Sequence, residues 1–399
     1  MENKYKNSYN LLQNDLKNKI LMLDGAMGTM IQRENLTADD FGGEKYEGCN
    51  DYLVLKRPDI IKNIHKKYLE AGSDIIETNS FGALDIVLKD YDLEDTVFEM
   101  NKKAAELVNE AIAEYRSEHP EVTRNLYVAG ALGPSNKSIS VTGGVTFEEL
   151  IHSYYTAVSG LLAGGVDLIL FETIQDTRNL KAAYLGLKKA MEENYTVPLM
   201  LSFTIESTGT TLAGQTADAF YYAVNHMNPF SVGLNCATGP EFMTQFLKTL
   251  NNISNTYISV YPNAGLPNED GEYEETPDTL SAKIEPFFQN NYLNIVGGCC
   301  GTTPEHIQKI KEKSVNYSPR VIDENKDFND VSGLIALETP KDRPIYVGER
   351  TNVIGSRIFK NLIASEKFDE ATEVARLQIK GRADVIDICL ANPDRDEIA

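Results

Sequence analysis

The chain has 399 residues, a formal net charge of −21 and 42% hydrophobic residues. This length allows one large α/β barrel or two to three average domains, and the apolar fraction is typical of a packed globular protein. The acidic balance excludes nucleic acid as a partner, because binding phosphates needs a positive field.

The sequence contains no run of about 18 apolar residues, so we expect no membrane span. The first twenty residues are polar and helical in pattern, with no apolar core and no cleavage-like site. We therefore expect no secretory signal and a cytoplasmic protein. In a reducing compartment, five clustered or isolated cysteines are more typical of catalysis or metal binding than of disulfides.

Eight short apolar runs alternate with longer amphipathic segments between residue 20 and residue 313. The runs are continuous and rich in Leu, Ile and Val, as buried parallel strands are. The predicted strands are Ile20–Asp24, Asp74–Thr78, Leu126–Leu132, Asp167–Glu172, Pro198–Phe203, Ser231–Asn235, Tyr257–Asn263 and Leu293–Gly298. The predicted helices are Pro58–Ala71, Leu93–Glu118, Thr146–Ala163, Asp176–Glu193, Ala217–Met227, Pro240–Ile253, Thr276–Gln289 and Pro304–Lys313. Within these helices His65 and His226 have polar neighbours, so we expect both at the surface.

Strand–helix alternation repeated eight times predicts an α/β protein with a (β/α)8 TIM barrel, whose active site lies at the C-terminal ends of the strands. The alternative is an open doubly wound sheet, which usually has a Gly-rich dinucleotide turn after its first strand. The segment Asp24–Gly28 lacks the third glycine of that fingerprint. The sequence therefore favours the barrel.

The character of the chain changes after the last predicted helix. We predict a barrel domain over 1–314 and a polar linker over 315–342. A strand at Ile345–Gly348, a helix at Phe368–Lys380 and a strand at Val385–Ile388 follow. Two strands and a helix cannot close a barrel or bury a core, so 343–399 is expected to be an incomplete second α/β unit.

Three cysteines fall at the predicted carboxyl ends of neighbouring strands. Cys236 follows the sixth strand, Cys299 and Cys300 follow the eighth, and Asn263 ends the strand between them. Three thiolates at one point repel one another unless they are protonated or bound to a soft cation, and zinc accepts sulfur ligands. Two alternatives stay open: the cysteines are small buried hydrophobes, or two of them form a redox pair.

Two carboxylates lie at other strand ends. Glu172 ends an apolar strand, where its charge needs either the amino group of a ligand or a Lys or Arg from a neighbouring loop. Asp24 allows the same interpretation, or it caps a helix. The amides of Gly25–Gly28 could hold a carboxylate if they open a helix or form a nest. Together these features indicate an amino acid substrate with a soft functional group.

Three segments, Leu23–Thr29, Gly233–Cys236 and Gly297–Thr302, resemble the homocysteine-binding domain of cobalamin-dependent methionine synthases, and the resemblance covers residues 15–313. Betaine- and S-methylmethionine-dependent homocysteine methyltransferases share this barrel. The segment Gly348–Val353 resembles the opening strand of the pterin-binding barrel that follows this domain in methionine synthases. The resemblance thus implies that 343–399 is the truncated start of that barrel.

The resemblance implies a zinc-dependent methyl transfer to L-homocysteine that gives L-methionine. The implied donor is methylcobalamin, bound by a separate cobalamin-binding module or corrinoid protein. Cys236, Cys299 and Cys300 would be the catalytic zinc ligands, and Asn263 would supply an oxygen ligand before substrate arrives.

The resemblance also implies the residues of the substrate site. Asp24 and Glu172 would bind the amino group of homocysteine, main-chain amides at Gly25, Ala26 and Met27 would take its carboxylate, and Asn235 would lie in the same site. A betaine- or S-methylmethionine-type transferase and a non-catalytic zinc-binding scaffold are the alternative functions. A Schiff-base lyase is disfavoured, because no predicted strand of the barrel ends in lysine.

Overall fold

The computed structural model describes residues 2–269, 271, 273–323, 331–337 and 343–391. The chain divides into two compact units, Met1–Phe328 and Asn329–Ala399. Of the predicted linker, 324–330 and 338–342 lie outside the described residues, as do 392–399 of the predicted second unit. Within the linker the structure describes a short antiparallel pair of strands, β9 (Val331–Ser332) and β10 (Ala336–Leu337).

Eight parallel strands form the sheet of the first unit, in the order β1-β8-β7-β6-β5-β4-β3-β2. A parallel bridge between Leu23 and Ile75 joins the two outer strands and closes the ring. The predicted (β/α)8 barrel is therefore confirmed. Its strands are β1 (Leu21–Met22), β2 (Ile75–Glu77), β3 (Tyr127–Leu132), β4 (Leu168–Ile174), β5 (Leu199–Phe203), β6 (Ser231–Asn235), β7 (Tyr257–Tyr261) and β8 (Ile295–Val296).

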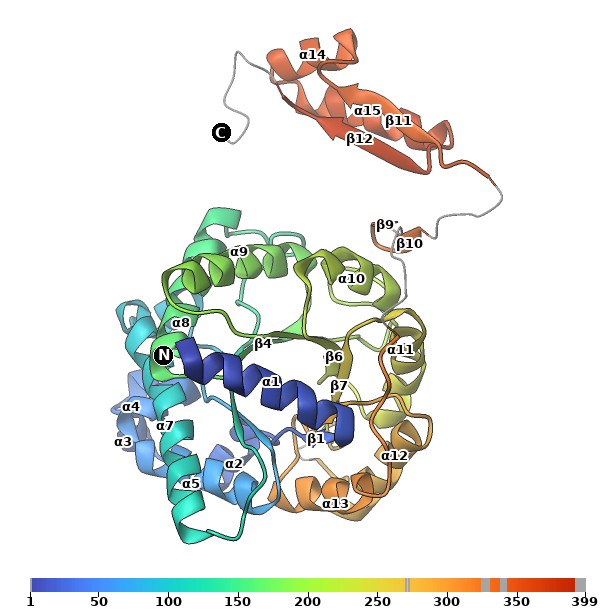
Figure 1. Ribbon diagram of the computed structural model, residues 1–399. Coiled ribbons are helices and arrows are strands. Elements are labelled where there is room, and N and C mark those ends of the chain that lie inside the picture. Colours follow the sequence, from blue (N-terminus) through green and yellow to red (C-terminus); the bar gives the residue numbers. More distant parts are fainter. Residues whose placement is uncertain (1, 270, 272, 324–330, 338–342, 392–399) are drawn as a thin grey trace. The chain divides into compact units, whose positions relative to one another are not determined.

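Helices follow the strands and surround the sheet (Figure 1). The main helices are α5 (Pro58–Glu70), α7 (Val97–Glu118), α8 (Phe147–Gly164), α9 (Thr177–Glu193), α10 (Ala217–Val224), α11 (Pro240–Ile253), α12 (Pro277–Gln289) and α13 (Pro304–Ser314). Their start signals act as expected: Thr146 accepts a hydrogen bond from the Glu149 amide at the start of α8. Short helices that the sequence pattern did not indicate are α2 (Met27–Arg33), α3 (Ala38–Phe41), α4 (Leu53–Lys56) and α6 (Asp85–Leu88).

The core has two layers because successive side chains of each strand point to opposite faces of the sheet. The outer layer packs between the sheet and the helices, and the inner layer fills the barrel. At the end where the strands begin, α1 (Glu2–Asn18) lies across the opening (Figure 1). Its Leu12 and Leu16 are fully buried among the inner-layer residues. This end of the barrel is therefore covered, and the opposite end is left for a functional site.

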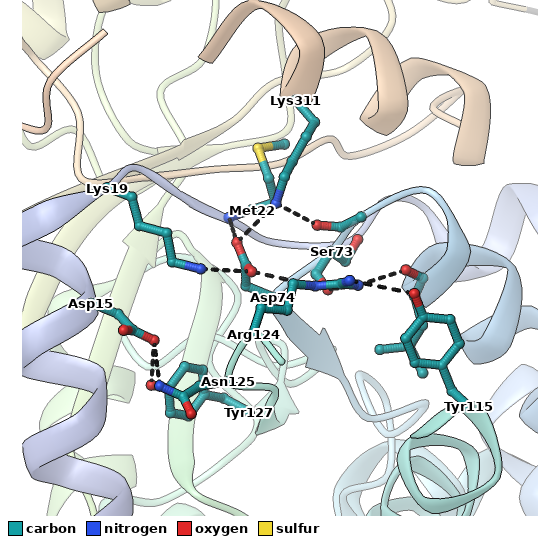
Figure 2. A network of polar contacts seen from close by, with 12 residues as sticks. Asp15, Lys19, Met22, Ser73, Asp74, Tyr115, Arg124, Asn125, Tyr127 and Lys311 are labelled. Carbon is teal, nitrogen blue, oxygen red and sulfur yellow. Dashed lines mark hydrogen bonds and ion pairs between the residues drawn. The ribbon is translucent and has the colours of Figure 1, made fainter. Parts of the chain in front are cut away.

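A buried carboxylate holds the covered end together (Figure 2). Asp74, which is fully buried before β2, accepts a hydrogen bond from the Met22 amide at 3.0 Å. Its carboxylate also meets the Lys19 and Lys311 ammonium groups at 3.0 and 3.4 Å and Nε of Arg124 at 3.5 Å. One buried charge thus joins α1, α13 and the segment before β3.

An Asp74→Asn variant should lose about 2 kcal/mol of unfolding free energy, because the three cationic side chains then lose the carboxylate that they share. The expected loss is moderate because the three cationic side chains are 20–38% exposed, so water can solvate them. Chemical denaturation measures it. Asp59→Asn is the control: it removes the 65% exposed partner of Arg57 and should change stability by less than about 0.5 kcal/mol. Equal effects of the two substitutions would contradict a special role for Asp74.

The predicted surface position of His65 is wrong. His65 lies on the inner face of α5 with no exposed surface, next to buried Ile64 and close to buried Tyr68. Burial lowers the pKa of its imidazole to about 3, so the ring is neutral at physiological pH. Neighbouring polar residues in the sequence misled the prediction, because adjacent helix positions face different sides. His226 is exposed as predicted.

The second unit contains the parallel strands β11 (Val347–Asn352) and β12 (Val385–Cys389). Between them run α14 (Arg357–Ala364), which was not predicted, and α15 (Phe368–Lys380). Its buried cluster is small, and several large apolar side chains are exposed, among them Ile354, Ile358, Leu377, Ile379 and Ile388. Among the described residues of both units, no helix combines the length and apolar character needed to cross a membrane.

Candidate metal and substrate site

The three predicted cysteines meet at the carboxyl end of the barrel. Sγ of Cys300 lies 3.9 Å from Sγ of Cys236 and 4.0 Å from Sγ of Cys299. All three sulfurs lie within 4.8 Å of one another, and the side chains are half-buried. Four-coordinate zinc with Zn–S bonds of about 2.3 Å holds its sulfur ligands about 3.8 Å apart. The donor set therefore fits a tetrahedral soft-metal site with one open position.

Backbone turns bring the cysteines together. Cys236 has a φ of 58°, which is unusual for a residue with a side chain, and its amide bonds the carbonyl of Tyr261 on β7. The Cys299 amide donates to the Pro262 carbonyl at 2.8 Å. Gly301 has a φ of 81°, so the chain reverses directly after Cys300. The turns after β6, β7 and β8 thus share one network of main-chain hydrogen bonds.

Contacts within the trio shift the pKa values of its thiols in opposite directions. Hydrogen bonds from Cys236 and then Cys299 lower the pKa of the Cys300 thiol to about 3. Hydrogen bonds of Cys299 with Cys236 and then Cys300, together with burial, raise the pKa of the Cys299 thiol well above its ordinary value. A group of thiols that shares its protons in this way is suited to losing them to a metal ion.

Buried carboxyl groups without a cationic partner lie at the same end of the barrel. Asp24 follows β1 and is 3% exposed, and Glu172 on β4 is 6% exposed. The Glu77 amide donates to Oδ2 of Asp24 at 3.0 Å, but Oδ1 of Asp24 and Oε1 of Glu77 are buried without a partner. Among the described residues, no Lys, Arg or His forms an ion pair with these three carboxyl groups. The described residues thus supply no Lys or Arg partner for Glu172, which was one of the two explanations that the sequence left open.

Burial strongly shifts the titration of these groups. Burial and then the charge of Cys300 raise the pKa of Glu172 to about 8. Burial is also the main reason why the pKa values of Asp24 and Glu77 lie well above their ordinary range, and in both cases Glu172 adds to the effect. Burial thus disfavours the charged form of these carboxyl groups, and a nearby ammonium group would favour it.

Asn263 follows β7 between the two cysteine turns. It is 4% exposed, and its Oδ1 is buried without a hydrogen-bond partner. The hydroxyl of the neighbouring Tyr261 is also buried without a partner. A buried amide oxygen without a donor is destabilising unless a ligand meets it. Asn263 is thus available to an incoming cation or ligand.

The segment Gly25–Met27 passes beside the turn after β8. A Cβ atom on Gly25 would lie 2.8 Å from Oγ1 of Thr302 and 2.9 Å from the Tyr68 ring, so only glycine fits. The Ala26 amide donates to Oγ1 of Thr302 at 3.1 Å. Met27 begins α2, so the segment opens a helix, as one of the sequence-based alternatives required.

Asn235 differs from the predicted carboxylates of the site in that its side chain has hydrogen-bond partners within the protein. It is fully buried at the end of β6. Its Oδ1 accepts hydrogen bonds from the Thr173 amide at 3.0 Å and from Oγ of Ser202 at 2.7 Å. Its Nδ2 donates to Oγ1 of Thr173 at 2.8 Å. The side chain is therefore bonded within the protein.

Two residues of the site were not among the predicted ones. Glu77 ends β2, and the sequence placed it with Asp24 among the residues at the strand ends, but no role in the site was predicted for it. Tyr273 is half-buried in the loop after β7 and contacts the thiol of Cys300, which contributes to the raised pKa of the Tyr273 phenol. No sequence signal distinguished Tyr273 from the other 19 tyrosines.

Comparisons with known proteins agree on the barrel. The family model for homocysteine S-methyltransferase matches residues 21–314. The homocysteine methyltransferase MmuM from Escherichia coli has a similar fold: its oxidized form matches with a TM-score of 0.64 at 23% identity, over 77% of this chain and 99% of that one. Its metallated form matches with a TM-score of 0.63 at 24% identity, over 77% and 100% of the two chains.

Proposed function

Because the chain belongs to the homocysteine S-methyltransferase family, we propose that its barrel transfers a methyl group to a zinc-bound L-homocysteine thiolate and gives L-methionine. The observation that carries this proposal is the pairing of two groups of residues at one end of the barrel. Three thiols suit a soft metal ion, and buried carboxyl groups without cationic partners suit an ammonium group. Homocysteine has both the sulfur and the amino group that such a site requires.

Cys236, Cys299 and Cys300 would hold the zinc ion, with Oδ1 of Asn263 as an oxygen ligand that substrate sulfur can replace. Bound zinc would lower the pKa of the substrate thiol, ordinarily about 8.5, so that it is a thiolate at neutral pH. The methionine product would leave because a neutral thioether is a poor zinc ligand. Three cysteine ligands would leave the site negatively charged, so the bound substrate sulfur would keep enough electron density to attack a methyl group. The chain supplies this charge through residues from two separate turns.

Asp24 and Glu172 would bind the ammonium group. Since Glu172 has a raised pKa, it holds a proton in the free protein and releases it when the ammonium group arrives. The main chain at Gly25, Ala26 and Met27 would face the substrate carboxylate, although the Ala26 amide already donates to Thr302. Asp24 and Glu172 orient the substrate and take no part in bond making, so their contribution is proximity.

The proposed donor is methylcobalamin, bound by a cobalamin-binding module or corrinoid protein, as in methionine synthases. The second unit supports this choice. Its β11 contains most of the Gly348–Val353 segment that resembles the opening strand of a pterin-binding barrel, and it pairs in parallel with β12. Exposed Ile358 and Leu377 are typical of helices that pack against further elements. We propose that 343–399 is the first part of such a barrel.

The donor is tested by measuring methionine formation from homocysteine with each candidate methyl compound in turn. With methylcobalamin we expect turnover. With methyltetrahydrofolate we expect none until a corrinoid is added, because the methyl group would have to pass through the corrinoid. Turnover with betaine or S-methylmethionine alone would instead favour the corrinoid-independent members of the family.

A further inference from the structure

Two residues at the proposed site have left-handed, strained backbone. Thr173, directly after Glu172, has a φ of 54°, and Cys236 has a φ of 58°. The β4–β5 register is also interrupted between Phe171 and Ile174, so Glu172 lies in an irregular part of the strand. Left-handed backbone is unfavourable by about 1 kcal/mol or more for a residue with a Cβ atom, and it persists only where neighbouring groups fix it.

Asn235 links these two turns, because its side chain contacts Thr173 and the residue directly precedes Cys236. The amide of Asn235 makes two hydrogen bonds to Thr173, one to its N–H at 3.0 Å and one to its Oγ1 at 2.8 Å. Through Ser202 at 2.7 Å the same amide is tied to β5, which separates β4 from β6 in the sheet. The Asn235 carbonyl in turn accepts from Oγ1 of Thr204 at 3.1 Å. A single residue thus connects the turn after Glu172 to the turn at Cys236.

We propose that Asn235 is a positioning residue, which sets the distance between the ammonium-binding carboxylate of Glu172 and the sulfur ligand of Cys236. This inference rests on the proposed function. The amino group and the sulfur of homocysteine are separated by a fixed carbon chain, so both ends bind only when the two anchoring points are correctly spaced. The Asn235 oxygen accepts from Thr173 and Ser202, and its Nδ2 donates to Thr173, so we assign its effect on the substrate to the positions of Glu172 and Cys236.

The test compares homocysteine with 4-mercaptobutyrate, which has the same thiol and carboxylate but no amino group. Dissociation constants are measured by calorimetry on the zinc-loaded full chain, together with zinc content. In Asn235→Ala we expect about 10- to 100-fold weaker homocysteine binding, as is typical when a supporting residue of a metal or catalytic site is lost. Binding of 4-mercaptobutyrate and one zinc per chain should be retained. Asn291→Ala, an exposed asparagine with positive φ outside the site, is the matched control and should leave both thiols unaffected.

A second variant separates positioning from direct contact. Glycine adopts positive φ without strain, so Thr173→Gly in the Asn235→Ala background should restore at least about threefold of the lost homocysteine affinity. If Asn235 bound the substrate itself, this change would restore nothing. Should Asn235→Ala fail to fold, Thr173→Val decides, because it removes only the Oγ1 acceptor and should weaken homocysteine about threefold while sparing 4-mercaptobutyrate.

The outcomes also separate this inference from the proposed function. If the wild-type chain binds neither thiol, the proposed function fails. If the wild type binds both, then equal weakening of both thiols in Asn235→Ala, loss of zinc, or an unchanged ratio of the two dissociation constants overturns the positioning role alone.

Discussion

In a Cys299→Ala variant we expect zinc to fall from one ion per chain to less than about a tenth, and kcat/KM for homocysteine to fall at least about 10³-fold. Removal of one sulfur from a three-sulfur site leaves Cys236 and Cys300 with two open metal positions. The fall in activity follows because a free thiol is mostly protonated at pH 7 and then attacks a methyl donor slowly.

Metal analysis and X-ray absorption measure this prediction. In the wild type the number of sulfur ligands should rise from three to four when homocysteine is added. Cys49→Ala is the matched control, because Cys49 is a free cysteine that lies outside the trio, and this variant should keep its zinc and activity. A wild type without zinc, or a sulfur shell that homocysteine leaves unchanged, would contradict the proposed metal chemistry.

The sequence was sufficient to predict the barrel, because the signal for a buried parallel strand repeats eight times and each run has a helix after it. It was insufficient for the short elements. The segment after Ala26 forms α2 beside the turn after β8, where the Ala26 amide donates to Thr302, and the sequence did not indicate this contact. The sequence also did not give the lengths of β1 and β8. Each strand has only two residues within a longer apolar run, because a strand ends where its backbone pairing ends and not where the apolar residues end.

For the site, the sequence placed residues at strand ends but did not determine what each side chain contacts. The convergence of Cys236 with Cys299 and Cys300 follows from the strand order, because β6 and β8 flank β7. The hydrogen bonds of Asn235 to Thr173 form where Thr173 and Cys236 have left-handed backbone. Neither residue is a glycine, so the sequence does not indicate these conformations. Whether Glu172 would meet a lysine or stay unpaired was equally open, since that depends on loops from several distant segments.

Glu172→Gln should weaken homocysteine binding by about 100-fold, because the ammonium group loses a buried charged partner. The same substitution should change the affinity for 4-mercaptobutyrate less than about threefold, since that thiol has no amino group. Calorimetry with the two thiols measures the difference. Equal weakening of both would mean that Glu172 supports the site as a whole and does not bind the amino group.

The same substitution has a second, independent consequence for the dependence of stability on pH. The pKa of Glu172 is about 8 in the folded protein and near its ordinary value of 4.5 when the chain is unfolded. Between these values the folded state binds more protons, so this residue makes the ligand-free wild type less stable as pH rises. Glu172→Gln removes that loss. The unfolding free energy of the variant should match that of the wild type near pH 4.5 and exceed it by about 1 to 3 kcal/mol at pH 8. The difference stays within this range because Asp24 and Glu77 can take up part of the proton binding that Glu172 loses in the variant. Denaturation of both proteins across this range measures it, and a stability difference that does not grow with pH would show that Glu172 is already ionised in the free site.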